Sequence, residues 1–260
     1  MSDLALAARP VSRGGDALVM MGRSLRLTRR NVDALFTALL LPVMLMLLFV
    51  YLFGGAIQTG TEYVTYVVPG VIMLCAGFGS SLTAVMVTMD MTGGIMDRFR
   101  SMDIGGASVL SGHVVASAIR NLMSTVLVLA VGFLIGFRAE AGLLDWLAAL
   151  GILLAFVTAF SWASAAIGLL AKTPEAASGF TFFVMFMPYP SSAFVPIETM
   201  PSWIHGFAEH QPFTPVIESM RGLLLDQPVG NSPWLALAWC AGLTIVSVTA
   251  TVVLFKRRTS

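Results

Sequence analysis

The fold class of this chain is decided by the stretch WLAALGILLAFVTAFSWASAAIGLLA, which occupies residues 146–171. It contains no Asp, Glu, Lys or Arg, and a helix needs about 20 apolar residues to cross the hydrocarbon core of a membrane. Backbone groups in lipid must be hydrogen-bonded within the protein, so an uncharged run of this length is expected to form a helix. The stretch therefore predicts a transmembrane helix.

Five further runs are almost free of charge, and together with the first they predict six spans. The third run contains Arg120, and Pro188, Pro190 and Pro196 interrupt the end of the fifth. Alternating strands of the kind found in outer-membrane barrels are not seen. We predict an all-α polytopic membrane protein whose residues 1–260 form one transmembrane domain. The expected spans lie at about residues 33–53, 66–89, 113–136, 146–170, 176–196 and 233–255.

Composition agrees with this class. The chain is 57% hydrophobic and 11% charged, with a mean hydropathy of +0.85, whereas soluble domains carry about 25% charged residues. The net charge of +1 argues against a nucleic-acid partner. Cys75 and Cys240 both lie in apolar runs, where they form neither a disulfide framework nor a metal site. We expect no bound metal.

The basic residues predict the orientation, because they concentrate in cytoplasmic loops. Twelve of the 15 fall on one side of the predicted spans, and the opposite loops hold only Arg138 and Arg221. Both termini are therefore expected in the cytoplasm. Arginine far outnumbers lysine, and Ala and Gly are abundant, which is typical of a high-GC bacterial genome. The expected location is the inner membrane of a bacterium.

Two segments outside the spans have a distinctive composition. Residues 16–30 place Leu18, Met21 and Leu25 on one helical face and arginines on the other, which predicts an amphipathic surface helix. The alternative is a basic flank that only orients the first span. Residues 197–227 are too apolar for a solvated loop and too rich in proline for a span. We expect one or two short helices there that re-enter the outer leaflet and pack against the bundle.

The chain has no nucleotide-binding motif of its own. A P-loop needs Gly-Lys followed by Ser or Thr, and the two lysines, Lys172 and Lys256, follow Ala171 and Phe255. Any ATP-driven activity therefore requires a separate ATPase subunit. We expect the chain to bind no cofactor.

A charged segment between the second and third spans is a candidate coupling element. It contains Asp97, Arg98, Phe99, Arg100 and Asp103, flanked by pairs of glycines. A short charged helix with an aromatic anchor is suited to docking in a groove of another protein. The alternative is a solvated loop that obeys the positive-inside rule.

Glu175 follows Pro174 at the start of the fifth run. This pair is explained by ordinary chemistry at a helix N-terminus, and contact with an ATPase is a second possibility.

Four side chains of the fifth run are candidates for a substrate path: Phe182, Met185, Phe186 and Tyr189. Aromatic and methionine surfaces accept varied apolar ligands. Dimer packing or lipid exposure would select a similar stripe. Arg120 is the one charge well inside a run, where it either extends to the membrane surface or forms a structural ion pair, or else serves transport directly.

Nine short stretches spread over most of the chain carry a family resemblance. They are Phe53-Gly54-Gly55-Ala56-Ile57, Val68-Pro69-Gly70, Asp97-Arg98-Phe99-Arg100-Ser101-Met102, Gly136-Phe137-Arg138, Thr173-Pro174-Glu175-Ala176-Ala177, Ser191-Ser192-Ala193-Phe194-Val195-Pro196, Thr199-Met200-Pro201, Gln211-Pro212-Phe213-Thr214-Pro215 and Arg221. In this order they resemble the type-2 ABC-transporter permeases, most closely the daunorubicin-resistance branch. Asp103 stands where the family usually has proline.

The resemblance implies a two-fold permease assembly in the lipid bilayer, formed with a second copy or a related permease. It also implies a cognate ATPase in two copies, docked on the cytoplasmic face through the charged segment. The chain itself would then be a transport subunit without catalytic residues.

The favoured function is export of an apolar or amphipathic drug-like molecule or lipid, driven by ATP on the partner. Export of a polysaccharide or glycolipid is the nearest alternative. An ion-coupled secondary transporter is disfavoured because no Asp or Glu lies well inside a predicted span. An intramembrane enzyme would need paired catalytic groups, which the sequence does not show.

Overall fold

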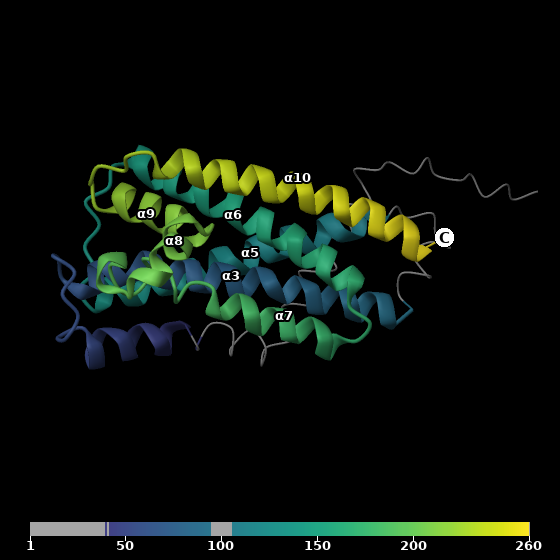
Figure 1. Ribbon diagram of the computed structural model, residues 1–260, viewed down its shortest axis with the longest axis horizontal. Coiled ribbons are helices and arrows are strands. Elements are labelled where there is room, and N and C mark those ends of the chain that lie inside the picture. Colours follow the sequence, from purple (N-terminus) through teal and green to yellow (C-terminus); the bar gives the residue numbers. More distant parts are fainter. Residues whose placement is uncertain (1–39, 41, 95–105, 260) are drawn as a thin grey trace, which may run out of the picture.

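The structure is a computed structural model that describes residues 40, 42–94 and 106–259. Every regular element in these ranges is helical, as Figure 1 shows. The elements are a helix at Pro42–Phe53 whose last turn is the π-helical η1 (Phe49–Phe53), α3 (Tyr63–Thr92), α5 (Gly106–Leu134), α6 (Leu143–Leu170), α7 (Pro174–Phe186), the 3₁₀ turn η2 (Ile197–Thr199), α8 (Ser202–His210), α9 (Phe213–Leu224) and α10 (Ser232–Thr259).

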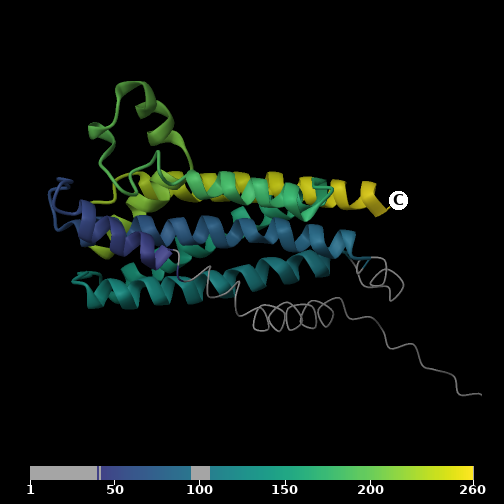
Figure 2. The ribbon, with the colours of Figure 1, turned by 90° about the horizontal axis from the view of Figure 1, so that it is seen from below.

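The long helices run side by side along the longest axis of the molecule (Figures 1 and 2). α3 is central and packs against α5, α6, α7 and α9, while α10 packs against α6 and α9. Successive long helices alternate in direction. We call one end of the bundle the Thr92 end, where α3, α6 and α10 end and α5 and α7 begin. The opposite end, with the Phe53–Tyr63 connection and the short helices α8 and α9, is the Phe53 end.

Among the described residues, four helices are long and apolar enough to cross a membrane: Tyr63–Thr92, Val109–Leu134, Leu143–Leu170 and Ser232–Phe255. They confirm helices at the predicted spans 66–89, 113–136, 146–170 and 233–255. α5 ends before residue 136 because Gly136 adopts a φ of +113°, and the N–H of Phe137 donates to the carbonyl of Gly132 at 2.8 Å. A glycine in this backbone region commonly terminates a helix.

The predicted span at 176–196 is helical only as far as Phe186. α7 ends at Phe186 and the chain continues in turns, because Pro188 and Pro190 lack the N–H that a further helical turn needs. Thirteen residues of helix extend about 20 Å, less than the roughly 30 Å of a bilayer core. The first predicted span, 33–53, is described over Pro42–Phe53. The remainder of that span, the predicted surface helix at 16–30 and the charged segment at 95–105 lie outside the described residues.

Two short helices, α8 and α9, occupy the segment predicted at 197–227. Their environments differ. α9 lies inside the bundle, where Phe213, Val216 and Ile217 are fully buried. α8 projects from the side of the bundle (Figure 2), and its Trp203 is 81% exposed. The presence of short helices at 197–227 is therefore confirmed, while their re-entry into the outer leaflet stays a prediction.

Apolar side chains fill the centre of the bundle and also cover its outside. Val67, Val71 and Ile72 of α3 are fully buried, whereas Leu144 of α6 and Ile245 of α10 are largely exposed. A helix bundle that is apolar inside and outside is expected where the surrounding solvent is lipid.

Candidate functional site

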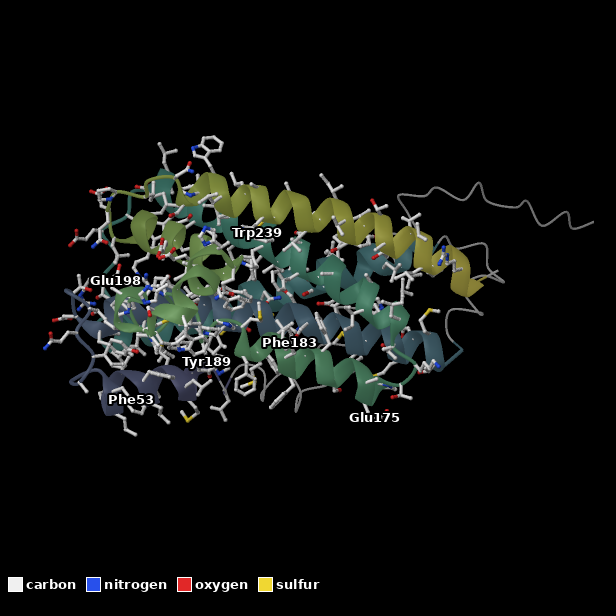
Figure 3. All side chains as sticks on the ribbon, viewed as in Figure 1. Phe53, Glu175, Phe183, Tyr189, Glu198 and Trp239 are labelled. Atoms are coloured by element: carbon white, nitrogen blue, oxygen red, sulfur yellow. The ribbon has the colours of Figure 1, made fainter. Side chains whose placement is uncertain are left out.

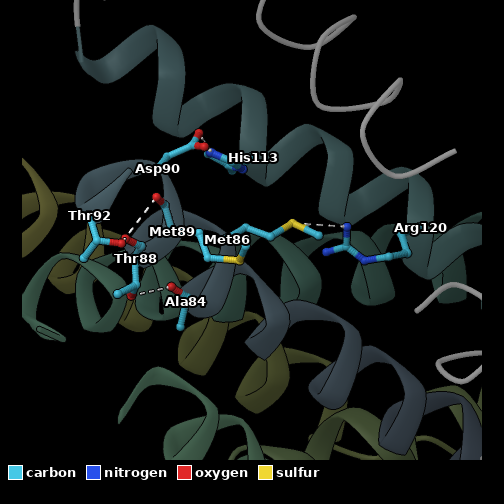
Figure 4. A network of polar contacts seen from close by, with 8 residues as sticks. All are labelled: Ala84, Met86, Thr88, Met89, Asp90, Thr92, His113 and Arg120. Atoms are coloured by element: carbon cyan, nitrogen blue, oxygen red, sulfur yellow. Dashed lines mark hydrogen bonds and ion pairs between the residues drawn. The ribbon is translucent and has the colours of Figure 1, made fainter. Parts of the chain in front are cut away.

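The helices α3 and α5 are joined by a buried polar pair close to the Thr92 end. Asp90 lies in the last turns of α3 and His113 lies two turns into α5, and their Oδ2 and Nε2 atoms are 3.0 Å apart (Figure 4). The two residues are 7% and 4% exposed. The predicted span ended at residue 89, so the sequence analysis counted Asp90 as lying outside the membrane. The structure continues α3 to Thr92 and buries this carboxylate.

Arg120 is buried deeper along the same interface, with 4% of its surface exposed. Its Nη2 donates to the carbonyl of Gly79 at 3.1 Å, and its Nη1 lies 3.9 Å from the sulfur of Met86 (Figure 4). Extension of this side chain to the membrane surface was one of the expected arrangements, and the structure does not show it. Within the described residues, the guanidinium of Arg120 contacts a carbonyl and a thioether. Arg120 therefore joins α5 to α3.

Small polar side chains extend this interface to α6. The Nδ2 of Asn121 donates to the carbonyl of Ser117 at 2.9 Å and lies 3.4 Å from the hydroxyl of Ser80. The hydroxyls of Ser161 and Ser117 are 2.8 Å apart. We call Asp90, His113, Arg120, Asn121 and these serines the polar seam.

The sequence analysis missed the polar seam, although the sequence carries a signal for it. The α5 members His113, Ser117, Arg120 and Asn121 are spaced by four, three and one residues, so they lie on one helical face. Inside a membrane such a polar face is expected to pack on another helix.

A row of aromatic rings runs along α7 and onto the turns that follow it. The ring centroids of Phe182 and Phe186 are 4.9 Å apart, those of Phe186 and Tyr189 are 5.8 Å apart, and Tyr189 stacks on Phe194 at 5.0 Å. Phe194 stacks in turn on Phe49 at 4.5 Å. We call these five rings the aromatic row.

The aromatic row is exposed along its α7 part. Phe182 and Phe186 are 64% and 50% exposed, and the neighbouring Phe183 is 62% exposed, whereas Met185 is half-buried. Figure 3 shows Phe183 and Tyr189 on this side of the molecule, between the two ends of the bundle. The structure thus brings three of the four predicted path residues into one row and adds Phe194 and Phe49, which are distant in sequence.

At the Phe53 end, the half-buried Arg221 connects three segments. The guanidinium of Arg221, on α9, lies 3.7 Å from the ring centroid of Tyr66 on α3. Its Nη2 donates to the carbonyl of Ser192 at 2.6 Å, and the hydroxyl of Tyr66 donates to the same carbonyl at 3.0 Å. The hydroxyl of Tyr63 donates to the carbonyl of Phe194. These contacts hold the Pro-rich turns after α7 against α3.

Gly70 explains why the turns approach α3 so closely. A Cβ atom at this position would lie 2.4 Å from the carbonyl oxygen of Ala193. Only glycine leaves room for the backbone of the turns at that point. The stretches Val68-Pro69-Gly70 and Ser191-Ser192-Ala193-Phe194 are therefore in direct contact.

Glu175 lies at the Thr92 end, far from Glu198 and Phe53 (Figure 3). It is exposed in the first turn of α7, where the N–H of Ala176 donates to the hydroxyl of Thr173 at 3.3 Å. Hydrogen bonding from its own backbone N–H, and then from Thr173, lowers the pKa of the Glu175 carboxyl. Negative charge is favourable at a helix N-terminus. The structure therefore places Glu175 near the ends of the helices that flank residues 95–105, while Asp97, Arg98, Phe99, Arg100 and Asp103 lie outside the described residues.

Comparisons with known proteins agree on one family. A family model described as "ABC-2 type transporter" matches residues 16–225. The chain is 30% identical over 226 residues to a daunorubicin resistance ABC transporter permease protein of Streptomyces coeruleorubidus, covering 86% of this chain and 80% of that protein. It is 25% identical over 242 residues to a probable doxorubicin resistance ABC transporter permease protein of Mycobacterium tuberculosis, covering 92% and 88%. A second permease of that organism, named for doxorubicin resistance, is 24% identical over 212 residues, covering 78% and 73%.

Proposed function

Because this multi-pass membrane protein belongs to the ABC-2 type transporter family, we propose that it is the permease subunit of an ATP-driven exporter of an apolar or amphipathic drug-like molecule or lipid. The observation that carries the substrate class is the exposed aromatic row on α7. Aromatic faces bind flat or apolar ligands without requiring a fixed hydrogen-bond pattern. The relatives' names, which refer to daunorubicin and doxorubicin resistance, point to the same chemistry.

The energy source is a separate ATPase, which the family implies and which the chain's lack of a P-loop lysine requires. We propose two copies of this ATPase and a second copy of the permease or a related one. Residues Asp97, Arg98, Phe99, Arg100 and Asp103 dock on the ATPase, with Glu175 beside them.

The Thr92 end faces the cytoplasm of a bacterial cell. Exposed Lys172 and Arg257 lie at this end, whereas Glu62, Glu140 and Glu209 are exposed at the other, which fits the positive-inside rule for the basic residues. Both termini are then cytoplasmic. The helix at Pro42–Phe53 and α7 with its turns complete the two further spans, and α8 and α9 form the re-entrant segment of the outer leaflet.

Substrate moves past Phe182, Met185, Phe186 and Tyr189, with Phe194 extending the path toward the Phe53 end. Transport requires that its affinity for this path differ between inward- and outward-accessible states.

The aromatic path can be tested in inverted membrane vesicles that contain this chain and its cognate ATPase, with doxorubicin as a fluorescent probe. Replacing Phe182 and Phe186 by alanine is expected to lower ATP-dependent uptake by about tenfold or more, since each truncation removes roughly 1–3 kcal/mol of apolar contact. Leu144→Ala, at a still more exposed apolar position on α6, is the control. If uptake equals that of the control, at equal membrane abundance and ATPase recovery, the aromatic row is not part of the substrate path.

The same vesicles distinguish an ATP-driven pump from an ion-coupled transporter. The second class is tested because ion coupling generally uses buried acidic residues and Asp90 is buried. An ATP-driven exporter keeps its uptake when a protonophore is added and loses it when the ATPase is inactivated. The opposite result would refute the proposed function.

A further inference from the structure

The segment 95–105, which carries the proposed docking residues, joins the end of α3 to the beginning of α5. The side chains of Asp90 and His113 connect these two helices next to that segment. We infer that the pair is a clasp: it makes α3 and α5 follow a displacement of residues 95–105 as one unit. This inference rests on the proposed function, and it assigns Asp90 and His113 as positioning residues for transmission rather than for docking.

The position of the pair suits this role. Asp90 is two residues before the end of α3, and His113 is seven residues after the beginning of α5. A carboxylate only accepts hydrogen bonds, so the Nε2–H of His113 donates to Oδ2 of Asp90. Both groups are buried, and the low local dielectric makes such a bond strong when made and costly when broken.

A second fixed point lies deeper along the same two helices. Arg120 donates to the carbonyl of Gly79, and the carboxamide of Asn121 packs against the same glycine, where an added Cβ would lie 2.3 Å from Oδ1 of Asn121. Two separated connections prevent α3 and α5 from rotating or sliding independently. The bond from Ser161 to Ser117 then connects this helix pair to α6.

A merely stabilising contact would not require these residue types. Burying a charge-bearing pair carries a desolvation penalty, and well-packed apolar residues of similar volume often stabilise a fold as well or better. What a buried directional bond adds is one preferred arrangement of its two helices. The clasp therefore predicts that transmission depends on the hydrogen bond rather than on folding stability alone.

The test compares variants that remove the bond with variants that keep it. His113→Leu and Asp90→Leu remove it. His113→Gln retains a donor near the position of Nε2, and Asp90→Asn retains an acceptor, although each loses the ability to carry charge. Ser164→Ala is the matched control, because Ser164 is fully buried in α6 and its hydroxyl donates within its own helix, to the carbonyl of Phe160.

The readout needs no knowledge of the substrate. All variants are made in a Ser192→Cys reference chain, co-expressed with the cognate ATPase, and the rate of thiol labelling from the outside is measured with and without ATP. Ser192 is buried in the turns at the Phe53 end, so its labelling reports opening there. A chain without Ser192→Cys gives the background from Cys75 and Cys240. Membrane abundance and ATPase co-purification are measured in parallel.

We expect ATP to change the labelling rate in the reference chain and in Ser164→Ala. In His113→Leu and Asp90→Leu, the ATP-dependent change in labelling rate should be smaller by about fivefold or more. A factor of about five is the lower end of the usual coupling between distant sites. Both should retain ATPase co-purification, and His113→Gln and Asp90→Asn should recover most of the response.

Three results would overturn the inference while leaving the proposed function in place. If the leucine variants respond to ATP like the reference, the pair does not transmit. If they lose the ATPase, the pair acts in docking. If the glutamine and asparagine variants fail together with the leucine variants, the hydrogen bond is not what matters. A reference chain that neither recovers the ATPase nor responds to ATP overturns the proposed function, and the clasp with it.

Discussion

Replacing Gly70 by alanine adds one methyl group at the point where α3 touches the turns after α7. The new Cβ would lie 2.4 Å from the carbonyl oxygen of Ala193 and 2.8 Å from its carbonyl carbon and Cα. Ordinary contacts begin at 3.4 Å, so the two backbones must separate by 3.4 − 2.4 = 1.0 Å. No flexible side chain is available to move aside, because all three near atoms belong to the backbone.

The cost follows from the contacts that this separation stretches. Overpacking of a tight interface costs about 1–3 kcal/mol. The bonds from Arg221 and Tyr66 to the carbonyl of Ser192 contribute about 1 kcal/mol each to stability and would be weakened or lost. The higher helix propensity of alanine stabilises the folded state by about 1 kcal/mol relative to glycine. The net destabilisation expected for Gly70→Ala is therefore about 2–4 kcal/mol.

The assay is thermal unfolding of the purified permease in detergent, followed by ATP-dependent doxorubicin uptake in vesicles. Gly151→Ala is the matched control: Gly151 is also in the middle of a long helix, and an added Cβ would meet nothing within 4 Å. We expect the control to be as stable as the parent or slightly more stable, and Gly70→Ala to unfold at a clearly lower temperature. Equal melting temperatures for the two variants would refute the argument that Gly70 exists for this close approach.

Three further predictions concern topology, docking and nucleotide binding. A cysteine at exposed Lys172 should be labelled only from the cytoplasm and one at Glu209 only from outside, and labelling of both from one side would refute the assigned orientation. Arg98→Glu and Arg100→Glu should abolish ATPase co-purification and efflux at normal membrane abundance, because breaking a buried charge pair costs roughly 2–5 kcal/mol whereas surface substitutions cost at most about 0.5 kcal/mol. Arg138→Glu is the control, and normal recovery of the ATPase with all three variants would show that the segment is only a connector. The chain purified without its partner should show no ATP binding by calorimetry, and saturable binding would contradict the absence of a P-loop.

Much of the fold was predictable from local composition. Uncharged runs locate the four long helices, because a helix in lipid needs only length and apolarity, both properties of a contiguous segment. The short helices α8 and α9 were also expected, since that segment is too apolar for a solvated loop and too rich in proline for a span. The end of α7 was misplaced even though Pro188 and Pro190 were visible. Apolarity continues past Phe186, but the hydrogen-bond ladder does not.

The candidate site was predictable only in part. Phe182, Phe186 and Tyr189 were found because their spacing places them on one helical stripe. Phe49 and Phe194 could not be found, because they join the row through stacking between segments that are distant along the chain. The coupling residues 97–103 were predicted from charge and from the family resemblance, and they lie outside the described residues.

The sequence by itself determined the membrane class and the positions of the long helices, because each depends on the content of one segment, and it determined the need for a separate ATPase because neither lysine of the chain stands in a P-loop. The tertiary structure alone decided which polar groups meet. Asp90 faces His113, Arg120 reaches Gly79, and Arg221 crosses from α9 to Tyr66. Hydrophobicity does not specify such pairs, because the polar face of α5 shows which of its residues turn inward but not which residues of a neighbouring helix they meet. The pairs form where helix rotation and close glycine contacts bring buried donors and acceptors within hydrogen-bond distance.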